Sequence, residues 1–125
     1  KIYCGVICTF NLFYRGISLK LLNKIKNSKK KIIAISPFAS GRLQVEYNSN
    51  YAFKKLIRKL LDKYKLSLVE FNITFLKEIG LIQEIIIGTK KLERFKQIEK
   101  IIENTKKVKI SQIDIDSILK MQKHF

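Results

Sequence analysis

Three short runs of apolar residues in this chain have the composition of buried β-strands. They cover residues 2–8, 31–36 and 84–88, and the last two are β-branched almost throughout. Between and after these runs, apolar residues recur at spacings of three and four, which is typical of amphipathic helices. Strands that alternate with helices favour a parallel sheet, because parallel neighbours cannot be joined by hairpins. The pattern therefore predicts an α/β fold.

Serine residues stand at the starts of several helical stretches, where a side-chain oxygen can cap the helix. Ser67 is followed by Glu70 at the spacing of a capping box, and Gly80 is suited to end the same helix. The predicted helices begin after Ser18, at residue 51, after Ser67, at residue 92 and after Ser111.

A long connection, residues 37–50, follows the second predicted strand. It exceeds the usual length for such folds, and long loops after parallel strands tend to carry function. Three strands alone make a poor parallel sheet, because both edge strands present unpaired backbone groups. We therefore expect an incomplete folding unit, either a fragment of a longer protein or the product of a split or decayed gene. Self-association through the open sheet edges is a further expectation.

The composition is that of a globular protein, with 46% hydrophobic residues and a mean hydropathy near zero. No apolar run approaches the roughly 18 residues that a membrane span needs, so we expect no membrane partner. Residues 1–13 are apolar, but no small-residue cleavage site follows them. We interpret them as a buried strand and not as a signal peptide.

The two cysteines, Cys4 and Cys8, lie four positions apart. On a strand this spacing puts both on one face, roughly 13 Å apart, which is too far for a disulfide. We expect reduced thiols and a cytoplasmic location. A metal site needs further ligands, and the single histidine, His124, is next to the end of the chain. No metal site is predicted.

The formal net charge of +16 raises the question of a nucleic-acid partner, since clustered basic residues neutralise phosphates. Only four of the 26 basic residues are arginine, the residue preferred for bidentate contacts. The lysines are spread over almost every predicted helix, together with heavy use of Ile and Asn. A compositional bias explains this pattern more simply than a binding stripe does. A basic α/β module that binds nucleic acid or acidic partners without catalysis stays as the alternative.

Four segments of the chain resemble the aldo-keto reductase family. Residues 32–43, Ile-Ile-Ala-Ile-Ser-Pro-Phe-Ala-Ser-Gly-Arg-Leu, resemble the family's seventh strand and the loop after it. Residues 84–97, from Glu-Ile-Ile-Ile-Gly-Thr-Lys to Phe-Lys-Gln, resemble its eighth strand and cofactor-binding helix. Residues 67–76 resemble the helix between these two, and residues 10–15, Phe-Asn-Leu-Phe-Tyr-Arg, resemble the segment after the sixth strand. The four segments occur in the family's order and reach to about residue 118.

The resemblance implies the C-terminal portion of a TIM (β/α)8 barrel, with three parallel strands and flanking helices in one partial domain over residues 1–125. It implies an oxidoreductase that transfers hydride between NADP and a carbonyl. The expected partners are NADP(H) and a small carbonyl substrate, provided that the N-terminal half completes the barrel.

By resemblance, two loops would hold the cofactor. Small residues let backbone donors approach phosphate closely, so the first loop would cover the pyrophosphate. Its residues are Ser36, Pro37, Phe38, Ser40, Gly41 and Leu43. A cationic helix start would hold the 2′-phosphate and favour NADP over NAD. Its residues are Gly88, Thr89, Lys90 and Arg94, with Gln97 near the adenine. The alternatives are a loop shaped only by packing and an ordinary solvated helix start.

The chain departs from the family pattern near the nicotinamide. Ile7 stands where the family usually has Gln, Ile35 where it has an aromatic residue, and Ile98 replaces a frequent Asn near the adenine. Asn11 fits the family segment, but a turn-capping role explains it equally well. The family's catalytic Asp, Tyr, Lys and His lie on strands that precede the matched region. We assign no catalytic residue, and we expect the chain to be inactive by itself.

Overall fold

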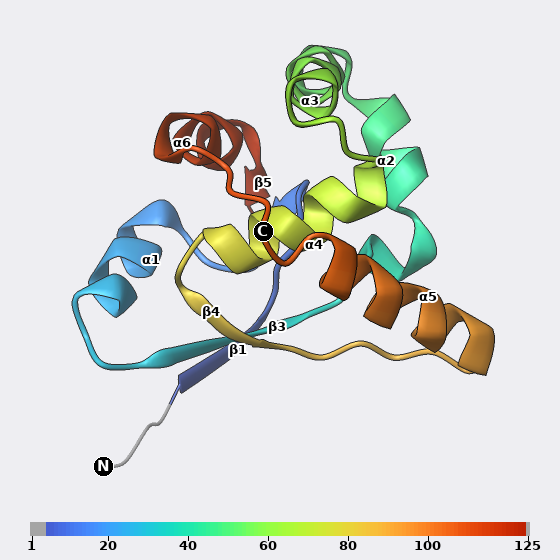
Figure 1. Ribbon diagram of the computed structural model, residues 1–125. Helices are drawn as coiled ribbons and strands as arrows, with labels where there is room; N and C mark the ends of the chain where they lie inside the picture. Colours follow the sequence, from blue (N-terminus) through green and yellow to red (C-terminus); the bar gives the residue numbers. More distant parts are fainter. Residues whose placement is uncertain (1–4, 125) are drawn as a thin grey trace.

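The computed structural model describes residues 5–124 (Figure 1). Its centre is a three-stranded parallel sheet with the strand order β1–β3–β4. The strands are β1 (Gly5–Thr9), β3 (Lys31–Ile35) and β4 (Ile82–Ile85). The prediction of an α/β fold with three parallel strands is confirmed.

The third strand lies earlier in the chain than residues 84–88, where it was predicted. Ile82 pairs with Ile32, and the register shifts by one residue before Glu84 pairs with Ile33. The Ile86 amide still donates to the Ala34 carbonyl, at 2.9 Å. Pairing stops there because β3 ends at Ile35, so the extent of its neighbour sets the end of β4.

The expected helices form where the sequence places them. Ser18, Ser67 and Ser111 each accept a backbone N–H at a helix start, and the capping box of Ser67 with Glu70 is complete. Gly80 follows the helix from Ser67 with a φ of 70°. These helices are α1 (Leu19–Lys26), α3 (Tyr51–Tyr64), α4 (Leu68–Glu78), α5 (Leu92–Asn104) and α6 (Gln112–Met121).

Residues 37–50 are not a simple loop, and on this point the prediction is wrong. They contain a 3₁₀ turn, η1 (Ala39–Gly41), and a short helix, α2 (Leu43–Ser49). Neither element starts with a side-chain cap, so the sequence lacks the usual signal. A two-residue parallel pair, β2 (Tyr14–Arg15) with β5 (Lys123–His124), was also not predicted.

The helices gather on one side of the sheet, as Figure 1 shows. Side chains alternate between the two faces of a strand. Cys8, Ile32 and Ala34 therefore point into a core beneath the helices, and all three are buried. On the other face Ile7 is 62% exposed, and Ile86, just after β4, is 53% exposed. This open face exposes apolar side chains beside the Lys31–Glu84 ion pair, although parallel sheets are normally covered on both sides.

Cys8 is a buried free thiol, and burial raises its pKa. Cys4 lies outside the described residues, so the predicted distance between the Cys4 and Cys8 thiols stays a prediction. Within residues 5–124, none of the helices combines the length and the apolar character needed to cross a membrane.

Candidate functional site

The segment after β3 has an unusual backbone. Ser36, Ala39 and Ser40 have φ angles of 51°, 51° and 55°, and Gly41 has a φ of 82°. Non-glycine residues in this left-handed region cost about 1–3 kcal/mol each and persist only where the surroundings hold them. Residues 36–41, the β3 loop, must therefore be fixed by contacts with the rest of the fold.

Two buried asparagines provide these contacts. Asn11 donates from Nδ2 to the Ser36 carbonyl at 3.1 Å, and Asn72 of α4 donates to the Pro37 carbonyl at 3.0 Å. Asn72 also accepts the Leu12 amide at 2.9 Å, so its side chain joins the ends of β1 and β3. Both side chains are fully buried, where such bonds are costly to break.

Asn11 caps the turn after β1, one of the two roles expected for it. Its Oδ1 accepts the amides of Phe13 and Tyr14, each at 3.0 Å. Asn72 was not among the predicted site residues, although it is a polar residue inside the largely apolar stretch 71–76. That break in the pattern was the available signal.

The predicted pyrophosphate residues differ in accessibility. Pro37 and Leu43 are buried, and the Leu43 side chain belongs to the core. Ser36 and Phe38 are partly buried, whereas Ser40 and Gly41 are exposed. A side chain built at Gly41 would meet no atom within 4 Å. The backbone at Ser40 and Gly41 is therefore the part of this loop that a ligand can approach.

The residues predicted to hold the 2′-phosphate surround the start of α5. No side chain caps this helix, whose N-cap residue is Lys91 and whose first turn contains the acidic Glu93. The Arg94 amide donates to the Lys91 carbonyl at 3.1 Å, so the Leu92 and Glu93 amides are the ones available to an anion. The Thr89 hydroxyl accepts the Lys91 amide at 3.2 Å. Lys90 and Arg94 are exposed, and within residues 5–124 neither has an acidic partner within 4.0 Å.

Gly88 and Gln97 are exposed as well, on either side of this helix start. The β3 loop and the helix start leave the sheet at one edge, because β3 and β4 run parallel (Figure 1). The structure thus brings both predicted groups to the carboxyl edge of the sheet. Their contact with one dinucleotide stays a prediction.

A tyrosine and a glutamate form a pair near the β3 loop that no sequence motif indicated. The Tyr14 hydroxyl donates to the Glu46 carboxylate of α2. Burial, then this hydrogen bond and the charge of Glu46, raise the pKa of Tyr14 to about 12, against a smaller opposing effect of Arg42. A phenol with so high a pKa is a weak general acid near neutral pH. It does not replace the family's catalytic residues.

Three aspartates lie on helices. Asp62 is exposed on α3, and Asp114 and Asp116 lie on α6. In the part of the chain that the structure describes, no three His, Cys, Asp or Glu residues are grouped as metal ligands.

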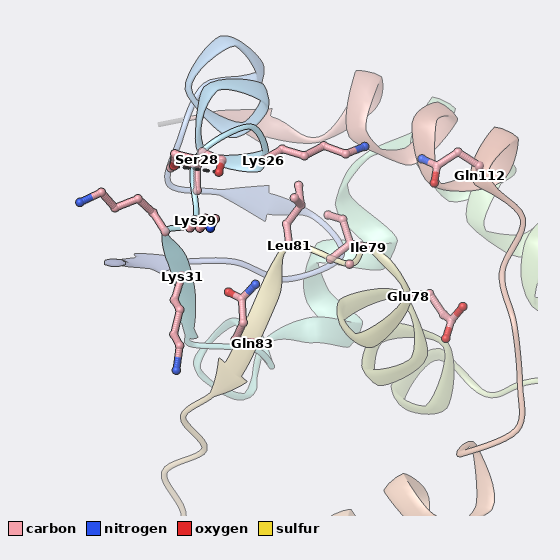
Figure 2. Close-up of a pocket in the computed structure, with 12 residues that line it drawn as sticks. Lys26, Ser28, Lys29, Lys31, Glu78, Ile79, Leu81, Gln83 and Gln112 are labelled. Carbon is pink, nitrogen blue, oxygen red and sulfur yellow. Dashed lines mark hydrogen bonds between the residues drawn. The ribbon is translucent and has the colours of Figure 1, made fainter. Parts of the chain in front are cut away.

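A cavity of about 520 Å³ lies at the opposite, amino edge of the sheet (Figure 2). It is bounded by the ends of α1 and α4 and by the starts of β3, β4 and α6. We call it the amino-edge cavity; its main lining residues are Ile25, Lys26, Lys29, Ile79, Gly80 and Leu81. None of the predicted cofactor-binding residues belongs to it.

Comparison with known proteins gave no match, either to a family model or to a curated protein. The resemblance to aldo-keto reductases thus remains a prediction from the four sequence segments.

Proposed function

We propose that this chain is the cofactor-binding portion of an NADP-dependent aldo-keto reductase. It would form the C-terminal part of a (β/α)8 barrel, and it would bind NADP(H) for hydride transfer to a small carbonyl substrate. The catalytic residues would come from strands that are not among those described here.

The arrangement of strands and helices supports a segment of a barrel. The three strands are neighbours in chain order, all parallel, with the helices on one face. A doubly wound sheet would carry helices on both faces. In a barrel the helices form an outer ring, and the other face of each strand points inward. The apolar side chains of Ile7 and Ile86 on the open face suit such an interior.

The observation that carries the proposal is the start of α5, which no side chain caps, together with Lys90 and Arg94, which have no acidic partner within 4.0 Å among residues 5–124. Free amides at a helix start favour an anion, and added basic side chains strengthen that preference. Lys90 and Arg94 would contact a 2′-phosphate, which NADP has and NAD lacks. The exposed backbone at Ser40 and Gly41 would lie against the pyrophosphate, held in place by Asn11 and Asn72.

NADP supplies the hydride in this chemistry. The residues of this chain would bind and orient the cofactor. By itself the chain should therefore bind NADP(H) without reducing a carbonyl.

Protection from thermal unfolding tests the proposal. We expect NADPH to raise the melting temperature and NADH to have a much smaller effect. The double substitution Lys90→Gln/Arg94→Gln removes two charge-assisted contacts, so it should weaken NADPH binding by at least about tenfold. It should leave the weak NADH binding unchanged, because NADH has no 2′-phosphate.

The control variant is Lys55→Gln/Lys59→Gln, which removes two exposed charges from α3. It should keep the full NADPH effect. Equal loss in both variants would show non-specific attraction to the +16 charge. Salt-dependent retention on DNA without any NADPH protection would favour the basic binding module instead.

A further inference from the structure

The amino-edge cavity has a strongly basic lining. Four lysines and one acidic residue, Glu78, line it. Within the described chain, Lys26 and Lys29 have no acidic partner within 4.0 Å. Glu78 is held from outside the cavity by Lys109 at 3.3 Å and by Lys77 at 3.8 Å. The acidic side chain is thus already neutralised, whereas two lysines are free to meet a ligand.

The interior of the cavity is apolar. Ile25, Ile79 and Leu81 line it beneath the lysines. Figure 2 shows Lys26 extended toward Gln112, with the Leu81 and Ile79 side chains below it in the view. A volume of about 520 Å³ is within the range of small-molecule sites. The site therefore suits a ligand with an anionic head and an apolar body.

The end of α4 adds backbone donors. Ile79 is right-handed, with a φ of −60°, and Gly80 is left-handed, with a φ of 70°. This succession is the geometry of a backbone anion nest. Both Gly80 and Leu81 line the cavity, and their amides have no hydrogen-bond acceptor among residues 5–124.

The end of α3 provides a comparison, because there the amide after the left-handed residue bonds back to the helix. There Lys65 is left-handed, and the Leu66 amide bonds back to the Leu61 carbonyl at 3.2 Å. The equivalent bond from Leu81 is absent from the described residues. The amides at the end of α4 are therefore available to an external acceptor.

Helix dipoles oppose an anion here, because α1 and α4 both end at the cavity. Each helix end carries about half a negative charge. Lys26 and Lys29 supply two positive charges in addition to the ion-paired side chains, and the two helix ends together carry about one negative charge, so about one positive charge remains. The local field still favours an anion.

We propose that the amino-edge cavity binds a small organic phosphate. The phosphate would be held by Lys26, Lys29 and the backbone amides of Gly80 and Leu81. The apolar body of the ligand would contact the side chains of Ile79 and Leu81. A phosphate has about two charges and three acceptor oxygens, which matches several separate donors. A planar carboxylate would call for an arginine fork, and no arginine lines the cavity.

Three probes separate the parts of this proposal: phenyl phosphate, inorganic phosphate and benzyl alcohol. We expect saturable binding of phenyl phosphate by titration calorimetry, with much weaker binding of the other two. The double substitution Lys26→Gln/Lys29→Gln should weaken the binding of phenyl phosphate by at least about tenfold. Amide chemical shifts of Gly80 and Leu81 should move during the titration.

The matched control is Lys90→Gln/Arg94→Gln, which removes two charges at the opposite edge of the sheet. It should keep phenyl phosphate binding while it loses NADPH binding, so the two proposals can fail separately. Equal weakening by both variants, or equal affinity for inorganic phosphate, would overturn this inference. Absence of binding at millimolar phenyl phosphate would do so as well.

Discussion

Asp114 is the residue that joins α6 to α3 through polar contacts. Its Oδ2 accepts the Tyr64 hydroxyl at 2.5 Å and the Lys63 ammonium at 2.7 Å. Tyr64 in turn accepts the Ser111 amide at 3.0 Å, just before α6. Burial alone would raise the pKa of Asp114, but hydrogen bonds from Lys63, Tyr64 and Ser111 outweigh burial and lower it.

The lowered pKa makes this contact sensitive to acid. The unfolded pKa of Asp is about 3.9. Since the folded pKa is lower, the stabilisation is complete above that value and is lost as the pH falls through the folded pKa. We expect Asp114→Asn to reduce the free energy of unfolding by about 1–2 kcal/mol at pH 7. The variant should also show a weaker loss of stability on acidification, measured by urea denaturation at several pH values.

Asp62→Asn is the control, because Asp62 is an exposed acid on α3. It should leave both the stability at neutral pH and the acid dependence nearly unchanged. If Asp62→Asn and Asp114→Asn behave alike, the contact between α3 and α6 does not stabilise the fold.

At the scale of elements, α4 links the sheet to the β3 loop through Asn72. Replacing this side chain leaves the Leu12 amide and the Pro37 carbonyl buried without partners. Each such group costs about 1–3 kcal/mol, so Asn72→Ala should lower the free energy of unfolding by about 2–4 kcal/mol. Hydrogen exchange should also become faster at the Leu12 amide and in residues 36–41.

The exposed Asn104, the last residue of α5, provides the comparison. Asn104→Ala should change the stability by a few tenths of a kcal/mol at most. Slow exchange at Leu12 in Asn72→Ala would show that the asparagine does not hold the loop.

Local signals made most helices predictable from the sequence. The three serine caps and the apolar spacing act within a few residues, so they are visible without the fold. Features that depend on residues far apart in the sequence could not be predicted. The end of β4 depends on its pairing with β3, β2 pairs with a segment about a hundred positions away, and α2 has no side-chain cap.

The residue types of the candidate site could be predicted from the sequence, but the contacts that hold its backbone in place could not. The small residues of the β3 loop and the cations around Lys90 were visible as motifs. The left-handed angles at Ser36 and Ala39, and the clamp by Asn72, arise from tertiary packing. The amino-edge cavity could not be predicted either, because the ends of five separate elements form it.

The whole molecule combines a high positive charge with a sheet face that exposes the apolar side chains of Ile7 and Ile86. β1 and β4 each pair only with β3 in the described part of the chain. The charge of +16 repels copies of the chain at low salt, whereas the open face favours association. Screening removes the repulsion and leaves the apolar attraction.

We therefore expect self-association to increase with salt. Sedimentation should show a larger average mass at about 500 mM than at about 50 mM salt, where charges are less screened. Ile7→Thr/Ile86→Thr keeps β-branched residues but makes the open face more polar, so it should reduce this increase.

Ile113→Thr serves as the control, because Ile113 is 78% exposed on α6, away from the sheet face. It should associate like the original chain. A monomer at both salt concentrations would contradict the expected role of the open face.

The turn after β1 depends on a side chain from the far end of the sequence. Gln122 donates from Nε2 to the Asn11 carbonyl at 2.6 Å and to the Leu12 carbonyl at 3.3 Å. Residues 11 and 122 are 111 positions apart. During synthesis, the ribosome therefore releases this turn long before its partner exists. The turn that positions Asn11 can reach its final form only after the nascent chain has emerged past Gln122.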